Sequence, residues 1–176
     1  MPDQLIPTLL IAALVLVAFA GMAAGWRARR RRQAHLPPVA PLPAEPGEPS
    51  LTIEALYVAT TLRDDPLERV AVRGLGMRAK ATVQVLPGGL ALALAGQDAV
   101  FLPAADLNGA GRATYAIDRV VERDGLVAVA WTLGDTPLDT YLRPSSSTDG
   151  TALVDAIQRI ARRSVASTTD PTEREN

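Results

Sequence analysis

Side chains that could perform catalysis are scarce in this sequence. It contains no cysteine and a single histidine, His35, which lies in a proline-rich stretch with no partner residue nearby. Three carboxylates, Asp118, Glu122 and Asp124, cluster beside an Asp-Gly pair, where acidic side chains are most often only solvated. Because an enzyme needs a base, a nucleophile or a metal within reach of one another, we expect no catalytic activity, no metal site and no cofactor.

Two short glycine motifs are the next candidates for chemistry. Gly74-Leu75-Gly76 and Gly109-Ala110-Gly111 resemble fragments of phosphate-binding loops. A phosphate loop, however, follows a parallel strand and opens a helix whose N-terminus binds the anion. Neither motif has these neighbours, so the sequence does not predict a nucleotide site.

Three basic residues, Arg73, Arg78 and Lys80, form the candidate ligand site. Arg78 and Lys80 alternate along a predicted strand, so both point to one face, where they could hold an anionic lipid headgroup or a phosphate through charge-assisted hydrogen bonds. The same pattern is typical of the solvated face of an ordinary strand, and Asp64 and Asp65 lie nearby. Contact with a protein through this face is a third interpretation.

The longest apolar segment lies close to the N-terminus. Residues 5–24 carry no charge, and about twenty helical residues cross the roughly 30 Å hydrocarbon core of a bilayer. We predict a transmembrane helix over residues 5–26, preceded by a short extracytoplasmic stretch, residues 1–4. A cleaved signal peptide is the alternative, since Ala18-Phe19-Ala20 fits a small-residue cleavage pattern.

The residues that follow the apolar segment predict its orientation. They are one interfacial tryptophan and five arginines: Trp26, Arg27, Arg29, Arg30, Arg31 and Arg32. Positive charge on one side only keeps that side in the cytoplasm, and interfacial tryptophan is typical of membrane helices. We therefore expect a single-pass protein of the cell membrane, with its N-terminus outside and its C-terminal domain in the cytoplasm. Gly21 and Gly25 form a short GxxxG motif that could support a weak homodimer.

Residues 27–50 are predicted to form a basic stop-transfer segment and a linker. Six prolines between positions 37 and 49 preclude a helix and favour an extended polyproline conformation of about 3.1 Å per residue. This composition predicts a spacer that could hold the domain up to about 50 Å from the bilayer. Two PxxP motifs in the segment could alternatively bind an SH3-like partner.

Residues 51–163 form the predicted domain. Apolar residues there recur with a period of two, and turn residues interrupt the pattern about every ten residues, which indicates antiparallel sheet. The predicted strands are 52–61, 78–85, 90–95, 99–102, 114–122, 126–133 and 138–143, with a loop at 104–111. The period becomes helical after residue 150, with Ser147 or Asp149 as N-cap, and residues 164–176 are predicted to be a disordered tail.

About seven strands followed by one amphipathic helix predict a mainly β domain, a bent antiparallel sheet or partly open barrel closed by the helix. Several stretches resemble the small membrane-anchored bacterial PH-like (pleckstrin-homology-like) domain proteins: residues 54–61, 88–90, 102–103, 127–131 and 139–143. The resemblance implies a PH-like fold, and it places Arg73, Arg78 and Lys80 where phosphoinositide-binding PH domains carry their basic cluster. The closing helix lacks the tryptophan that eukaryotic PH domains usually have there.

Composition limits the possible partners. The net charge is −1, and five of the eighteen basic residues lie beside the predicted membrane helix, so the remaining chain is mildly acidic and nucleic acid is not an expected partner. We expect a non-catalytic interaction module that binds another, unidentified protein at the inner face of the membrane. The alternatives are a PH-like domain that senses anionic lipid or a phosphorylated ligand, and an accessory subunit of a membrane transport or envelope complex.

Overall fold

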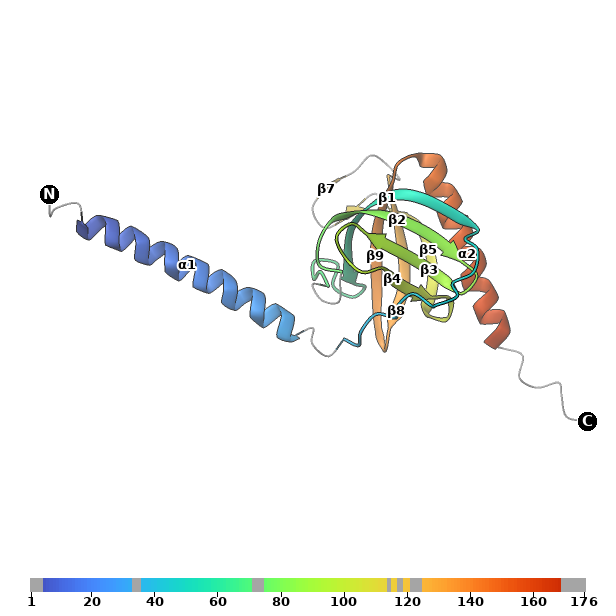
Figure 1. The fold of residues 1–176 in the computed structure, drawn as a ribbon, viewed down its shortest axis with the longest axis horizontal. Helices are drawn as coiled ribbons and strands as arrows, with labels where there is room; N and C mark the ends of the chain where they lie inside the picture. Colours follow the sequence, from blue (N-terminus) through green and yellow to red (C-terminus); the bar gives the residue numbers. More distant parts are fainter. Residues whose placement is uncertain are drawn as a thin grey trace, which may run out of the picture. The chain divides into compact units, whose positions relative to one another are not determined.

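The computed structural model describes residues 5–32, 36–70, 75–113, 115–116, 119–120 and 125–168. The chain divides into two compact units, Met1–His35 and Leu36–Asn176. The first contains the helix α1 (Leu5–Arg32), and the second contains all the strands and the helix α2 (Ser147–Thr168) (Figure 1). Only residues 33–35 separate α1 from the second unit.

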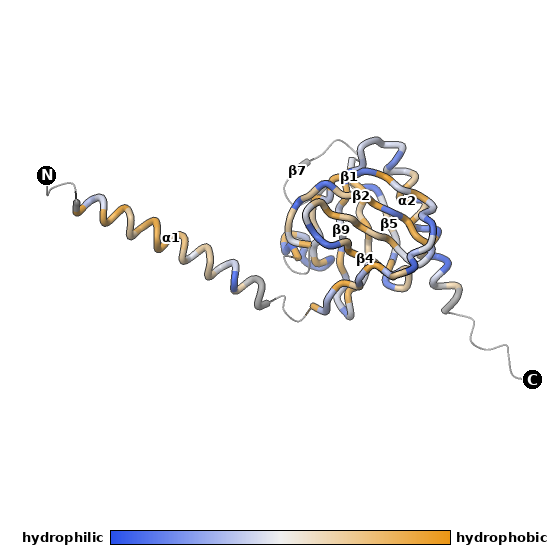
Figure 2. The backbone as a smooth tube through the Cα atoms, in the orientation of Figure 1, coloured by the Kyte–Doolittle hydropathy of each residue, from blue (hydrophilic) through white to orange (hydrophobic). Residues whose placement is uncertain are grey.

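Helix α1 is apolar on every side over most of its length (Figure 2). Within its segment Ile6–Ala28, an 18-residue window has a mean hydropathy of 2.4, and none of that window is buried. The predicted helix, long and apolar enough to span a membrane, is therefore present. It continues to Arg32, so the predicted basic segment from residue 27 is the last part of α1 rather than the start of a linker.

A seven-stranded antiparallel sheet forms the body of the second unit, in the order β4-β3-β2-β1-β9-β8-β5. Its strands are β1 (Leu51–Leu62), β2 (Ala79–Leu86), β3 (Gly89–Leu94), β4 (Val100–Pro103), β5 (Leu107–Ala113), β8 (Leu126–Leu133) and β9 (Thr136–Pro144). Strand β1 pairs with both β2 and β9 and so joins the two halves of the sheet. The predicted mainly β fold, an open antiparallel sheet with a C-terminal helix, is confirmed.

The fifth strand along the chain lies earlier in the sequence than predicted. Residues 104–111, predicted as a loop, contain the short 3-10 helix η2 (Ala104–Asp106) and most of β5. The segment 107–113 has two glycines and no β-branched residue, so its strand depends on pairing with β8 rather than on local preference. Within the predicted strand 114–122, the described residues form two short paired strands, β6 (Tyr115–Ala116) and β7 (Arg119–Val120). Asp118, Glu122 and Asp124 lie outside the described residues.

Helix α2 closes the sheet with an apolar stripe. The stripe consists of Leu153, Ala156, Ile157, Ile160 and Ala161, all buried. The N-cap is Ser146, whose Oγ accepts the Asp149 N–H at 3.0 Å, so neither predicted candidate, Ser147 or Asp149, is the cap. The helix is also longer than predicted. Residues 164–168, assigned to the tail, are helical, and Ser164 Oγ lies 2.9 Å from the carbonyl oxygen of Ala104 in η2.

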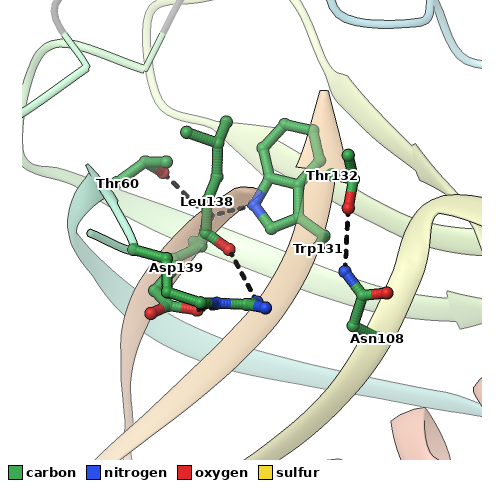
Figure 3. Close-up of polar contacts among 8 residues, drawn as sticks. Thr60, Asn108, Trp131, Thr132, Leu138 and Asp139 are labelled. Atoms are coloured by element: carbon green, nitrogen blue, oxygen red, sulfur yellow. Dashed lines mark hydrogen bonds and ion pairs between the residues drawn. The ribbon is translucent and has the colours of Figure 1, made fainter. Parts of the chain in front are cut away.

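A chain of hydrogen bonds crosses the core between β8, β9 and β1. Trp131 Nε1–H donates to Thr140 Oγ1 at 2.9 Å, Thr140 Oγ1 lies 2.8 Å from Thr60 Oγ1, and Thr60 Oγ1 lies 2.8 Å from Tyr57 Oη. Tyr57 Oη is also 2.7 Å from the Leu75 carbonyl oxygen, which can only accept (Figure 3 shows the Trp131 end). Each hydroxyl has one proton to donate. The four bonds are therefore donated in one direction: Trp131 donates to Thr140, Thr140 to Thr60, Thr60 to Tyr57, and Tyr57 to the Leu75 carbonyl.

The proline-rich segment 36–50 belongs to the domain and is not a free spacer. Leu36 is 1% exposed within the main core, and Val39 packs against the same core. Ala40 forms a bridge to β4, where Phe101 N–H donates to its carbonyl oxygen at 3.2 Å. Burial of Leu36 contributes about 2 kcal/mol, which a segment held away in solvent would forgo. The domain therefore begins at Leu36 and not at residue 51.

Candidate functional site

The structure describes two of the three predicted basic residues. Arg73 lies outside the described residues, while Arg78 and Lys80 are both exposed near the start of β2. Lys80 pairs with Leu56 of β1, and Arg143 of β9 pairs with Leu56 from the other side. Lys80 and Arg143 therefore flank one apolar residue on the outer face of the sheet. The sequence did not reveal Arg143, because only the β2-β1-β9 order brings these distant segments together.

The surface around Leu56 is electrically mixed. A hollow of about 530 Å³ there is lined by Leu56, Lys80, Arg143 and also Glu54. Glu54 Oε1 accepts the Thr82 hydroxyl at 2.7 Å, which holds a carboxylate next to the two cations. The arrangement could receive a single anionic group, but the carboxylate offsets part of the attraction.

A large groove lies between the sheet and α2. It has a volume of about 730 Å³, within the range of about 300–1,000 Å³ that is usual for ligand sites. We call it the α2 groove. Its lining residues are Leu107, Asn108, Gly109, Ala110 and Gly111 of β5, Ala128 and Ala130 of β8, and Gln158, Ala161 and Arg162 of α2.

Small residues on paired strands form the floor of the α2 groove. Gly109 pairs with Ala130, and Gly111 pairs with Ala128, so these four residues lie on one face of the sheet. Buried residues of β8 alternate with Ala128 and Ala130, which places this face outward. With no side chain larger than a methyl group, the outer face is bare backbone here, and this explains the depression.

The two glycines in the floor of the groove differ in whether the backbone requires a glycine. Gly109 follows a bulge in β5 and has a φ of 140°, which favours glycine. Gly111 has no such backbone angle, and a Cβ added to it would meet no atom within 4 Å. Neither its conformation nor crowding requires glycine at 111, although a strand glycine weakens its strand. Glycine at such a position often marks the close approach of another group.

Helix α2 covers the free edge of β5. Gln158 Nε2 donates to the Ala110 carbonyl oxygen at 3.0 Å, which occupies an acceptor in the middle of the edge. Arg112 Nη2 donates to the Ser147 carbonyl oxygen at 2.7 Å and to Thr151 Oγ1 at 3.0 Å near the start of the helix. An unpaired edge invites another strand, and this helix blocks it.

The groove has chemistry suited to binding. Arg162 is the charged residue among those that line it, and no carboxylate is among them. In the described segments, no three His, Cys, Asp or Glu residues gather as a metal site would need. The pKa values of Tyr57 and Tyr141 are raised, in both cases chiefly by burial, and neither tyrosine lines the groove.

Comparison with known proteins places this fold in a family. The family described as "Bacterial PH domain-like" matches residues 36–158, from the first buried residue of the domain into α2. The chain belongs to this family. The PH-like domain therefore includes the proline-rich segment from Leu36, in agreement with the packing of that residue.

More distant comparisons add little. No curated protein matches the chain. Among the solved structures that match, a chain of "The 8S snRNP Assembly Intermediate" shares 10% sequence identity with a TM-score of 0.48, over 79% of the present chain and 96% of that chain. A likeness of this degree does not carry any function over to the PH-like domain described above.

Proposed function

We propose that this protein is a membrane-anchored, non-catalytic PH-like module that binds another protein at the cytoplasmic face of the membrane through the α2 groove. The observation that carries the proposal is the groove itself. It has a volume of about 730 Å³, its floor is backbone and methyl groups, and neither the backbone angle nor crowding requires a glycine at position 111.

The anchoring part of the proposal rests on α1. Its apolar segment ends where the arginines begin, and positive charge on the C-terminal side favours retention of the domain in the cytoplasm. A reporter active only outside the cytoplasm, fused after Asn176, should be silent, whereas one active only inside should work. The reverse result would contradict the orientation.

The binding part is tested by a matched pair of substitutions. Full-length wild type, Gly111→Val and Ala93→Val are each purified from membranes with their bound proteins. Ala93 is an exposed residue of β3, away from the groove, so Ala93→Val is the control. The proposal expects a discrete partner that accompanies wild type and Ala93→Val and is depleted with Gly111→Val. Equal recovery with all three would contradict it.

Contact with anionic lipid is a second candidate function, and one observation favours it. In the segment between β1 and β2, the apolar residues Leu67 and Met77 are 73% and 71% exposed, and the exposed Arg78 follows directly. Exposed apolar side chains beside a cation suit the interface of an anionic membrane. None of these three residues lines the α2 groove, so the two candidates can be tested separately.

A further inference from the structure

The α2 groove has a shape and a charge that restrict what it can bind. We propose that it takes a partner segment presenting one aromatic side chain, which lies flat on Gly111 and Ala128, with a neighbouring carboxylate that pairs with Arg162. The inference rests on the proposed function and specifies the chemistry of the partner.

The aromatic side chain follows from the bare floor. In sheets, an aromatic ring that lies over a strand glycine covers the backbone that the glycine leaves open to water. No described atom of this protein occupies that position over Gly111, since nothing lies within 4 Å of its added Cβ. A flat ring contacts a flat surface over its whole area, and aromatic residues bring the largest buried area per side chain.

The carboxylate follows from the charge at the side of the groove. Arg162 is exposed and forms no ion pair with any of the residues that the structure describes. Asp139, which pairs with Ala130 from β9, is already bound to Arg63 at 3.2 Å. A partner carboxylate would thus find a free cation and no competing acid in the lining, and a basic partner would be repelled.

Addition of a strand to β5 is not the mode of binding. The acceptor at Ala110 is occupied by Gln158, and the Arg112 side chain also bonds to α2, so the helix is held against this edge. A partner would therefore dock by its side chains while its backbone remains outside the sheet. Mutations in the floor should abolish binding, whereas loss of backbone amides in the partner should not.

Panning of a random peptide library tests the inference. The full chain in nanodiscs is the target, empty nanodiscs remove lipid binders, and enriched peptides are screened against Gly111→Val and Ala93→Val. We expect peptides that share an aromatic residue with Asp or Glu within two positions, and that lose binding to Gly111→Val but not to Ala93→Val.

The charged contact is then measured with one enriched peptide. Changing its acid to the amide, or Arg162→Gln in the protein, should each weaken binding about three- to five-fold, as for an exposed pair. The two changes together should weaken it no further than either alone. Arg163→Gln is the control, because Arg163 is exposed on α2 but does not line the groove.

Three results would overturn the inference. Peptides that depend on Gly111 but lack an aromatic residue or an acid would disprove the chemistry and leave the groove as a binding site. Additive effects in the double change would disprove the pair with Arg162. No enrichment, or enrichment indifferent to Gly111→Val, would disprove peptide docking in the groove, and the co-purification experiment would then decide separately whether a protein binds there at all.

Discussion

The indole of Trp131 donates its N–H to Thr140 Oγ1 at 2.9 Å, and both residues are almost completely buried. This bond begins the one-way chain of hydrogen bonds that ends at the Leu75 carbonyl oxygen. It fixes the largest core side chain, on β8, to its neighbour β9, and through Thr60 to β1. The residues that give the domain its volume are thus also tied together by polar bonds.

Breaking the chain in its middle should cost more than breaking a surface bond of the same kind. Thr140→Val keeps the side-chain volume but leaves the Trp131 N–H without an acceptor and removes the hydroxyl that bonds to Thr60 Oγ1. We expect a loss of about 2–3 kcal/mol in the free energy of unfolding. Thr132→Val is the matched control, because it removes only the bond from Asn108 Nδ2 at 2.9 Å on the surface (Figure 3), and should cost less than about 1 kcal/mol. Equal losses in urea titrations would contradict this account.

The free energy of unfolding should decrease at alkaline pH because of Tyr57. Burial raises the pKa of its phenol in the folded state well above the usual value of about 10, so the unfolded state ionises first. The contribution to stability is complete below about pH 10 and falls as the pH rises further, by at most about 1.4 kcal/mol per pH unit.

Urea denaturation of residues 36–168 at stepped pH measures this effect. Tyr57→Phe should be less stable than wild type at neutral pH, because the Leu75 carbonyl loses its donor, but its stability should fall less steeply above about pH 10. Tyr141→Phe is the comparison, since the pKa of Tyr141 is also raised by burial and by Asp139 although the residue is only half-buried. Identical slopes for wild type and Tyr57→Phe would contradict the assignment.

The packing of the proline-rich segment predicts a contrast between two of its leucines. Leu36 is 1% exposed and Leu42 is 39% exposed. Leu36→Ala should therefore lower the free energy of unfolding by about 2–5 kcal/mol, and Leu42→Ala by less than about 1 kcal/mol. If both substitutions are neutral in chemical denaturation, residues 36–50 are a free spacer after all.

The surface around Leu56, which carries Lys80 and Arg143, should not bind anionic vesicles strongly. Glu54 lies beside Lys80 and Arg143, so we expect no saturable binding of residues 36–168 to vesicles rich in anionic lipid. Binding that is saturable, weakened by salt, and lost when Leu67, Met77 and Arg78 are all replaced by Glu would favour the lipid candidate instead. Vesicle sedimentation at low and physiological ionic strength distinguishes these outcomes.

Most of the fold could be predicted from the sequence because most of its strands follow a local pattern. The alternation in 126–133 and the helical period after residue 150 fixed β8 and α2 closely. Strand β5 was not predicted because its glycines disfavour a strand, and only its pairing with β8 offsets that preference. The burial of Leu36 was not predicted, because the prolines on both sides of Val39 and Ala40 are typical of a solvent-exposed linker. In the structure, the packing of Leu36 and Val39 against the core outweighs that composition.

The candidate site was less predictable for the same reason. The basic residues were visible as a pattern within one strand, but Arg143 joins Lys80 only through the strand order. The α2 groove combines β5, β8 and α2, and its floor is a set of small residues with no chemical signal of their own. The one clue in the sequence was the Gly109-Ala110-Gly111 motif, which resembles a fragment of a phosphate loop but lacks that loop's neighbours, and which lies in an edge strand.

The most direct test of the proposed function is site-specific photocrosslinking of the full-length protein in native membranes. A photoreactive side chain at position 128, in the floor of the α2 groove, should join the protein to a discrete partner. The same side chain at position 93 on β3 should not, and Gly111→Val should abolish the product formed from position 128. Equal crosslinking from both positions, or a product at 128 that survives Gly111→Val, would contradict binding through the α2 groove.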